Sequence, residues 1–368
     1  MIAIVSCGHK SDDERIYFKQ IKSLVKFGYS VKYFTRSESK VNLSTHNLNH
    51  INLQKCNYSV FEFINFVIKQ IDDVKVLHIH EYELLPLAKK FKKKYNKKII
   101  YDVHDSLYHM WDTFSSYRGI LKKVINGSLS IYEKYYLKYV DEIILANKPF
   151  DNISYDSVRY KKTIIENFPL IKNLGNPKSL SKNPIILYQG QISDDRGLSF
   201  LVRAMKLVVL RYPNVRLEIV GPSRPLDYKS ILQKQIDNQK LDHFINIYDD
   251  IPHLDIWQYL KRASIGVIPS IKSPRVSVDT PTKLFEYMAS GCVVIGTDLP
   301  PVRHFLNGAG VLVKHSSSDD LANAIIKVLS DKKLFESLSM QAIEHIKNYY
   351  NWSFPEQKLL ALYKRSEL

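Results

Sequence analysis

Short apolar runs alternate with amphipathic segments along this 368-residue chain, and the alternation occurs twice. In the first half, apolar runs at 2–7, 29–35, 76–80, 99–103 and 142–146 are separated by segments of helical periodicity, and 163–168 is a last short strand. The pattern restarts at 185–188 and continues with runs at 215–220, 245–248, 265–268, 293–295 and 311–313. Strands that alternate with helices in this way predict doubly wound parallel sheets. The expected fold class is therefore α/β, with two Rossmann-like domains.

The segment 169–184 is rich in Asn, Pro, Gly, Ser and Lys and separates the two halves. We expect an N-terminal domain at 1–172, a linker at 173–184, a C-terminal domain at 185–350 and a final helix at 351–368. Ligands of open α/β sheets bind outside the carboxyl ends of the strands. Two such domains that face each other are expected to form a cleft for a ligand.

The formal net charge of +16 predicts an acidic partner surface or a strongly anionic ligand. Seven lysines crowd the segment 89–98, a density that suits anionic lipid or nucleic acid, although a solvated helix end explains it equally well. The three cysteines have no metal-ligand spacing, and no apolar run reaches 18 residues. We therefore expect reduced thiols and a protein that is soluble or peripheral to a membrane.

Two common nucleotide-binding motifs are missing from the strand ends. Only Gly8 follows the first strand, no Gly-x-Gly-x-x-Gly follows any strand, and there is no Walker A lysine motif. These absences argue against a dinucleotide-dependent oxidoreductase and a P-loop enzyme. A nucleotide would have to bind by another device.

The segment 279–296 offers such a device. Thr280 is a suitable N-cap, Pro281 suits the first helical position, and Gly291 ends the helix before a buried strand. A helix N-terminus favours an anion such as a diphosphate, and Lys283 lies in its first turn. Glu286 lies one turn further along, where its carboxylate could reach the hydroxyls of a ribose. The alternative is an ordinary helix start with a solvated Glu286–Lys283 ion pair.

Several segments together resemble the retaining glycosyltransferases of family 4, which have the two-domain GT-B fold. The segment 281–291 is similar to the donor-nucleotide helix of that family, and 188–197 is similar to its diphosphate loop. The segments 78–86 and 101–105 are similar to strand ends that line the acceptor and sugar side. The segment Asp12-Asp13-Glu14-Arg15-Ile16 resembles the opening of a subgroup that acts in surface-polysaccharide assembly. In the family a C-terminal helix crosses back to the first domain, which implies the same for 351–368.

The resemblance implies a role for individual residues. Glu286 would bind ribose, Lys283 and Arg196 would meet the diphosphate, and His104 would touch the transferred sugar. Gly8 would allow close approach of the donor. The implied catalytic residues are His104, Arg196, Lys283 and Glu286. The implied donor-binding residues are Gly8, Gly190, Gln191, Arg196, Thr280, Pro281, Thr282, Lys283, Leu284 and Glu286, and the acceptor-side residues are His80, Glu81, His104 and Asp105.

Two positions depart from the family pattern. The family has a second glutamate eight positions before the first, where this chain has Val278 next to Asp279. Gln191 stands where the family has an arginine in its diphosphate loop, which removes a positive charge. Either Lys283 and the helix N-terminus hold more of the diphosphate, or activity is weak.

The resemblance implies retaining transfer of a hexosyl or N-acetylhexosaminyl group from a nucleotide diphosphate sugar to a hydroxyl of a glycan. The expected acceptor is lipid-linked, in bacterial surface-polysaccharide assembly, and the expected location is cytoplasmic or peripheral at the inner face of the membrane. An anionic membrane surface is a candidate partner, nucleic acid is not expected as one, and no cofactor or metal is implied. The alternatives are a nucleotide-sugar epimerase of the same fold, or a basic binder of anionic surfaces or nucleic acid on a degenerate scaffold.

Two further features allow alternative interpretations. His78 and His80 share a face of one strand and could ligate a metal, but the sequence offers no third ligand at a suitable spacing. Five aromatic or sulfur-containing residues precede Lys122 and Lys123, and could either enter a membrane interface or pack the loop onto its own domain: Tyr108, Met110, Trp111, Phe114 and Tyr117.

Overall fold

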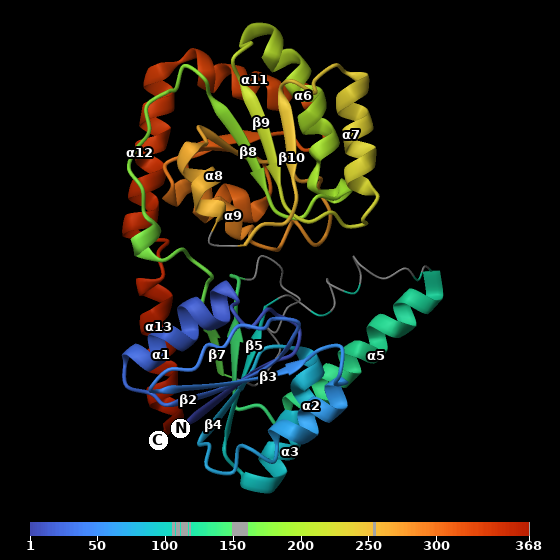
Figure 1. Cartoon of the computed structure of the whole chain (residues 1–368), viewed down its shortest axis with the longest axis vertical. Helices are drawn as coiled ribbons and strands as arrows, with labels where there is room; N and C mark the ends of the chain where they lie inside the picture. Colours follow the sequence, from blue (N-terminus) through green and yellow to red (C-terminus); the bar gives the residue numbers. More distant parts are fainter. Residues whose placement is uncertain are drawn as a thin grey trace. The chain divides into compact units, whose positions relative to one another are not determined.

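The computed structural model describes residues 1–104, 107, 111, 117, 119–148, 161–252 and 255–367 of the chain (Figure 1). These residues form two compact units. Unit 1 contains Met1–Asn167 and Trp352–Leu368, and unit 2 contains Phe168–Asn351. In the described part of the chain, every helix is too short or too polar to span a bilayer.

Unit 1 contains a seven-stranded sheet whose strand pairs are all parallel. The strand order is β3-β2-β1-β4-β5-β6-β7, which places β1 and β4 at the point where the order reverses. The strands are β1 (Ile2–Ser6), β2 (Val31–Ser37), β3 (Leu48–Gln54), β4 (Val76–Ile79), β5 (Lys98–Val103), β6 (Glu142–Leu145) and β7 (Lys161–Ile164).

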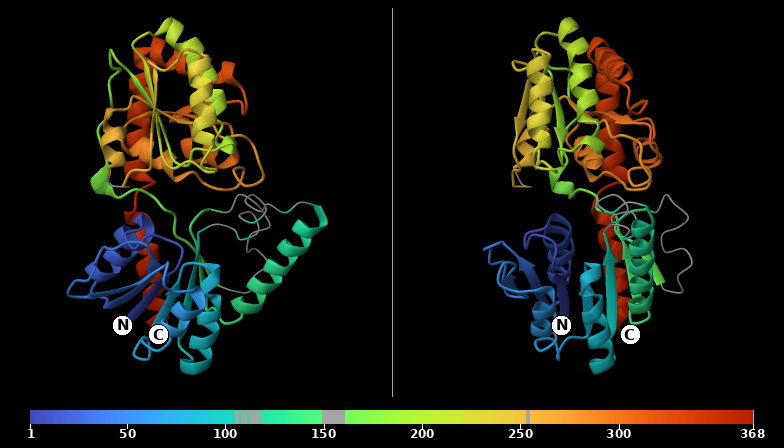
Figure 2. Two further views of the ribbon diagram at one scale, coloured as in Figure 1. Left: turned by 45° about the vertical axis from the view of Figure 1, so that its right-hand side comes forward. Right: turned by 90° about the vertical axis from the view of Figure 1, so that its right-hand side faces the viewer.

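Helices cover both faces of this sheet (Figures 1 and 2). Apolar residues of α2 (Val60–Val67), α3 (Leu85–Tyr95) and α5 (Gly119–Leu137) form the core on one face. The other face packs against a π-helix, η1 (Glu14–Ile21), its continuation α1 (Lys22–Lys26), and α13 (Ser353–Glu367). A 3-10 turn, η2 (Tyr82–Leu84), precedes α3.

The last helix closes unit 1 through polar contacts as well as packing. Trp352 Nε1 donates a hydrogen bond of 2.9 Å to Ser23 Oγ, which in turn donates to Glu356 Oε1 at 2.6 Å. Tyr363 is fully buried and shares a hydrogen bond of 2.7 Å with His78 Nδ1 on β4. Residues from the far end of the chain therefore belong to the core of the first unit.

Unit 2 repeats the same topology with six parallel strands in the order β10-β9-β8-β11-β12-β13. The reversal lies between β8 and β11. Its strands are β8 (Ile185–Gln189), β9 (Arg216–Val220), β10 (Ile245–Tyr248), β11 (Ile265–Ile268), β12 (Val293–Thr297) and β13 (Gly310–Val313). Its helices are η3 (Ile171–Asn173), η4 (Asp194–Arg196), α6 (Leu198–Arg211), α7 (Tyr228–Asn238), α8 (Ile256–Arg262), α9 (Thr282–Ala289), α10 (Pro300–Leu306), α11 (Ser318–Ser330) and α12 (Lys332–Asn348).

The predicted α/β class with two Rossmann-like domains is confirmed. One strand was not expected from the sequence, the edge strand β3. Its residues are mostly half-exposed and include two asparagines and a histidine, so it lacks the apolar run that marks the other strands. It is held by seven paired positions along β2.

Candidate functional site

The candidate site in unit 2 begins with the loop that follows β8, at the point where the strand order reverses. Gly190 has a φ of 119°, in a region that side chains rarely adopt. A Cβ at this position would lie 2.8 Å from Lys283 Nζ. The missing side chain therefore lets the ammonium group of Lys283 lie directly over the loop.

Lys283, in the first turn of α9, places a destabilised positive charge beside this loop. Its side chain is half-buried, and Nζ lies 4.2 Å from the centroid of the Tyr188 ring. Burial and the nearby Arg196 guanidinium lower the pKa of Lys283 to about 7, against the opposing charges of Glu286 and Asp195. A bound anion would favour the protonated form, so the site suits a diphosphate.

The N-terminus of α9 lies beside this lysine, but it starts one residue later than expected. Pro281, not Thr280, occupies the N-cap position, because its ψ of 108° keeps it extended. Thr280 Oγ1 is buried and has no hydrogen-bond partner among the described residues, so the predicted cap is wrong. Within the described part of the chain no side chain caps α9, and its N-terminus with the exposed Thr282 can receive an anion. Leu284 is fully buried and its N–H bonds to Pro281 O, so it serves the core instead of a ligand.

Glu286 is held at the end of β8 by its neighbours on the sheet. The side-chain amide of Gln189 donates a short hydrogen bond to Glu286 Oε2. Gln189 is itself buried, and its backbone N–H donates to Tyr287 Oη at 2.9 Å. The carboxylate is therefore oriented at the same strand end as Lys283 and Gly190.

Arg196 supplies the second cation from the short turn η4. Its side chain is half-buried, and Nε lies 3.6 Å from Asp195 Oδ2 but makes no hydrogen bond to any described residue. Gly197 follows with a φ of 71°, and a Cβ there would lie 1.9 Å from Pro269 O. The backbone at Gly197 therefore lies against the residue that follows β11, and Ile271 N donates to Asp195 O at 3.0 Å, which holds η4 and Arg196 beside the end of β11.

The two departures from the family pattern also have defined places. Asp279, next to Val278, forms an ion pair of 3.0 Å with Arg275 within its own loop. Gln191 donates from Nε2 to Ser193 Oγ at 3.3 Å, and its carbonyl accepts from Tyr188 Oη at 2.7 Å. Both residues therefore support the loops of unit 2 through local contacts.

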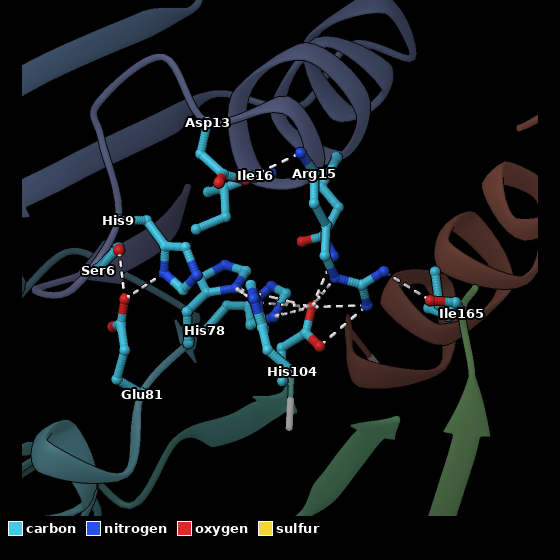
Figure 3. A network of polar contacts seen from close by, with 12 residues as sticks. Ser6, His9, Asp13, Arg15, Ile16, His78, Glu81, His104 and Ile165 are labelled. Atoms are coloured by element: carbon cyan, nitrogen blue, oxygen red, sulfur yellow. Dashed lines mark hydrogen bonds and ion pairs between the residues drawn. The ribbon is translucent and has the colours of Figure 1, made fainter. Parts of the chain in front are cut away.

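In unit 1, the polar residues at the strand ends form a connected network (Figure 3). Glu81 follows β4 and accepts four hydrogen bonds from the loop after β1: from Ser6 Oγ (2.5 Å), Cys7 N (2.9 Å), Gly8 N (3.1 Å) and His9 Nδ1 (2.7 Å). Glu81 and the Gly8 N–H are thus used within the protein. Glu81 fixes the shape of the first loop at the switch point of this sheet.

His9 carries a positive charge because of this contact. Burial opposes protonation, but the hydrogen bond and the charge of Glu81 outweigh it and raise the pKa of His9 to about 9. The His9 side chain is 30% exposed, and its ring lies 4.5 Å from the ring of His104. The loop therefore presents a fixed imidazolium beside His104.

A second part of the network is centred on Asp102 at the end of β5. Arg15 donates to both carboxylate oxygens of Asp102 at 2.9–3.2 Å and also to Ile165 O at 2.7 Å. Gln20 Nε2 donates to Asp102 Oδ2 at 2.6 Å. Burial disfavours the charged carboxylate, yet the Arg15 guanidinium outweighs it and holds the pKa of Asp102 below its usual value.

Three histidines line the same carboxylate. Their nearest nitrogens lie 3.6–4.0 Å from Asp102 Oδ2, and His80 Nδ1 shares a hydrogen bond of 3.0 Å with His104 Nε2. Burial lowers the pKa of His78 to about 4 and of His80 well below 6.5, and it also lowers the pKa of His104. All three imidazoles are therefore neutral at pH 7.

The sequence offered no third metal ligand for His78 and His80, but the fold supplies one. Candidate ligand atoms of His78, His80 and Asp102 lie within 4.8 Å of one another. Both oxygens of Asp102 are already bound by Arg15, which places a fixed positive charge where a cation would lie. The cluster fits a hydrogen-bonded scaffold better than a metal centre.

The structure thus gathers the predicted site residues into one group in each unit. Gly190, Gln191, Arg196, Lys283 and Glu286 meet in unit 2, and Gly8, His80, Glu81 and His104 meet in unit 1; Asp105 lies outside the described residues. Sequence reasoning missed His9, Arg15 and Gln189. Each lies at or near a strand end or in the segment 12–16, and this position is the sequence signal that could have indicated it. Its hydrogen-bond partner is distant in the chain, so the sequence does not show the contact.

Comparison with known proteins agrees with this geometry. Residues 172–345 match the sequence model of the family described as glycosyl transferases group 1. The chain is also 24% identical over 303 residues to phosphatidyl-myo-inositol mannosyltransferase of Mycolicibacterium smegmatis, which covers 79% of this chain and 71% of the relative. These matches support a glycosyltransferase.

Solved structures share the architecture of the whole chain. Sucrose-phosphate synthase of Thermosynechococcus elongatus superposes with a TM-score of 0.79 at 20% identity, covering 99% of this chain and 98% of that one. Anabaena HepE in complex with UDP and glucose gives a TM-score of 0.78 at 14% identity, covering 99% of each chain. At these identities the likeness establishes the fold, which is GT-B.

Proposed function

We propose that this glycosyltransferase moves a sugar from a nucleoside diphosphate sugar to a hydroxyl of a glycan, and that unit 2 binds the donor. The observation that carries the proposal is the positive charge at the switch point of unit 2. Lys283 has a pKa of about 7 beside Arg196, next to the uncapped α9. This arrangement is unfavourable until an anion binds, and a diphosphate supplies the missing negative charge.

In this proposal, Lys283 and Arg196 act on the leaving group. Negative charge grows on the diphosphate as the bond to the sugar breaks, so cations fixed beside it stabilise the transition state more than the ground state. The cost of holding Lys283 beside Arg196 is met in folding, and no reorganisation is needed during the reaction. Lys283 and Arg196 would supply, beside the diphosphate, the positive charge that a divalent cation could otherwise supply.

Glu286 is proposed to bind the ribose hydroxyls. The hydrogen bond from Gln189 fixes one carboxylate oxygen, Oε2, and orients the group at the strand end. A carboxylate next to a diphosphate site suits vicinal hydroxyls because each can donate a hydrogen bond to it. We expect binding of both UDP and GDP to depend on this residue.

We propose that transfer retains the anomeric configuration by a front-face displacement, in which the departing phosphate accepts the acceptor proton. His104 is proposed to bond the transferred sugar; its lowered pKa makes it a neutral hydrogen-bonding group. The acceptor is proposed to be a lipid-linked glycan in surface-polysaccharide assembly at the cytoplasmic face of a membrane. The supporting observations are the resemblance of the segment 12–16 and the similarity to a mannosyltransferase that is named for a phospholipid.

Lys283→Ala and Glu286→Ala test the donor site. Removing one positioned charge costs about two to three orders of magnitude in kcat, so Lys283→Ala is expected to lower transfer by that factor. Glu286→Ala is expected to weaken nucleotide binding about tenfold or more, measured by titration calorimetry with UDP and GDP. Lys206→Ala, an exposed lysine of the same unit, is the matched control and should leave both unchanged.

Four results would contradict the proposal or one part of it. Unchanged turnover in both site variants would reject the donor-site assignment. Isomerisation of a nucleotide sugar without any acceptor would identify an epimerase, and binding of DNA but of no nucleotide would identify an anionic-polymer binder. Product with the opposite anomeric configuration, seen by NMR, would reject retention alone.

A further inference from the structure

The outward face of α5 in unit 1 carries apolar side chains that no described residue covers. Ile120 is 83% exposed, Ile131 70%, Val124 56% and Leu121 53%. Positions 120, 124 and 131 lie on one stripe of a helix with 3.6 residues per turn. The C-terminal part of α5 packs on the core of unit 1 through Tyr132, Tyr136 and Leu137, so the described residues cover one side of α5 and leave its other apolar side exposed.

The exposed face of α5 is continuous with a basic face on α3. Lys89 of α3 donates a hydrogen bond of 2.7 Å to Tyr135 Oη of α5, and Lys138 lies 4.0 Å from the centre of the same ring. Together the two helices contain eight lysines and one acidic residue, Glu133. Figures 1 and 2 show α5 beside α3, with its N-terminal half extending away from the sheet.

We propose that this α5–α3 surface docks unit 1 onto a membrane that contains anionic lipid. The partner must accept aliphatic side chains and also attract a dense set of lysines, and the interface of an anionic bilayer offers both. A second copy of this chain would bring the same lysines against them, which like-charge repulsion disfavours. The proposal rests on the proposed lipid-linked acceptor, because docking would bring unit 1 to the surface where such an acceptor lies.

The orientation of α5 on the membrane follows from its composition. The helix has 19 residues, and Lys122, Lys123 and Lys134 interrupt its apolar sequence. A helix of this kind lies in the plane of the interface with its apolar stripe buried among the acyl chains. The exposed lysines at 123, 134 and 138 then lie beside the stripe, at the level of the lipid headgroups.

The test is sedimentation of the full chain with vesicles of phosphatidylcholine, alone or with about one third phosphatidylglycerol. The wild type should bind the anionic vesicles. Ile120→Ser, Val124→Ser and Ile131→Ser combined should weaken the partition coefficient by about one to two orders of magnitude. Lys123→Gln, Lys134→Gln and Lys138→Gln combined should weaken it about fivefold per charge on anionic vesicles only.

A matched control uses three exposed apolar residues of unit 2, changed to serine together: Leu210, Leu226 and Ile231. This control should bind vesicles like the wild type. Ile131→Trp gives an independent reading, since its fluorescence should shift to shorter wavelength on anionic vesicles, whereas that of Leu226→Trp should not.

The proposal would be overturned if the combined Ile120, Val124 and Ile131 serine variant bound anionic vesicles as well as the wild type, or if the wild type did not bind them. A dimer in solution that the same variant converts to a monomer would also overturn it, because the surface would then face a second copy. UDP or GDP binding, measured in parallel, separates this inference from the proposed function. If the α5 serine variant loses vesicle binding and still binds nucleotide, the result supports docking. If the wild type binds vesicles but no nucleotide, the result contradicts the proposed function only.

Discussion

The two units place polar clusters at the same point of the same topology, but they balance charge differently. In unit 1, Arg15 is paired with Asp102 and His9 with Glu81. In unit 2, burial and the nearby Arg196 lower the pKa of Lys283 to about 7, and the opposing charges of Glu286 and Asp195 do not restore it. A cluster whose charges are paired through direct hydrogen bonds builds a scaffold, whereas a cluster with a buried lysine of lowered pKa is suited to an anionic ligand.

This difference predicts that changes in unit 1 act first on stability and changes in unit 2 act first on binding. Asp102→Ala should show the largest effect. Arg15 is only 4% exposed and would be left as a buried charge without its partner, which costs about 3–5 kcal/mol of unfolding free energy. Urea denaturation on a Trp257→Phe background measures unit 1, since Trp111 and Trp352 both belong to it.

Asp73→Ala is the matched control for that prediction. Asp73 is 48% exposed and pairs with Lys32 at 2.7 Å, so its loss should cost less than about 1 kcal/mol. Equal, small effects of both substitutions would mean that the Asp102 cluster is not the scaffold of unit 1.

The next effect is the pH dependence of nucleotide binding in unit 2. The proposed diphosphate would bind the protonated form of Lys283 and raise its pKa, so binding would take up a proton above pH 7. Affinity for UDP or GDP should fall by about tenfold per pH unit above about pH 7. Calorimetry across this range measures it. Lys283→Arg, which stays protonated, should flatten the curve, and a flat curve in the wild type would place the diphosphate elsewhere.

Glu81→Gln should give the smallest of the three effects. The pKa of His9 is about 9 in the folded protein and 6.5 in the unfolded chain. The His9–Glu81 pair therefore stabilises the folded protein below pH 6.5, and this stabilisation is lost as the pH rises through 9. Because His9 is 30% exposed, we expect a loss of only about 1–2 kcal/mol near pH 6. In an NMR titration of Glu81→Gln, the midpoint for the His9 ring should shift toward the ordinary histidine pKa. An unchanged midpoint would show that Glu81 does not cause the raised pKa of His9.

The architecture was predictable from the sequence because buried parallel strands consist of continuous apolar runs. The edge strand β3 was not, since only Leu48 among its residues is buried and its pairing with β2 replaces local propensity. The start of α9 was misplaced by one step because the extended ψ of Pro281 is a property of the fold, which the residue type does not reveal.

The site was predictable where neighbouring residues form it, as with Lys283 and Glu286 on one helix. It was not predictable where distant strand ends meet. His9 and Glu81 are 72 positions apart, and Arg15 and Asp102 are 87 apart. The family resemblance implied an acceptor-side role for Glu81, yet the β1 loop uses both of its carboxylate oxygens. Only the register of β1 beside β4 makes that contact visible.

The return of α13 to unit 1 has a consequence for the order of synthesis. Unit 2 is one continuous segment and can fold on the ribosome as soon as Asn351 emerges. Unit 1 must wait for Tyr363, which bonds to His78 at the centre of its sheet. A nascent chain therefore carries an unfinished first unit throughout translation, and a chaperone has its longest opportunity to bind there.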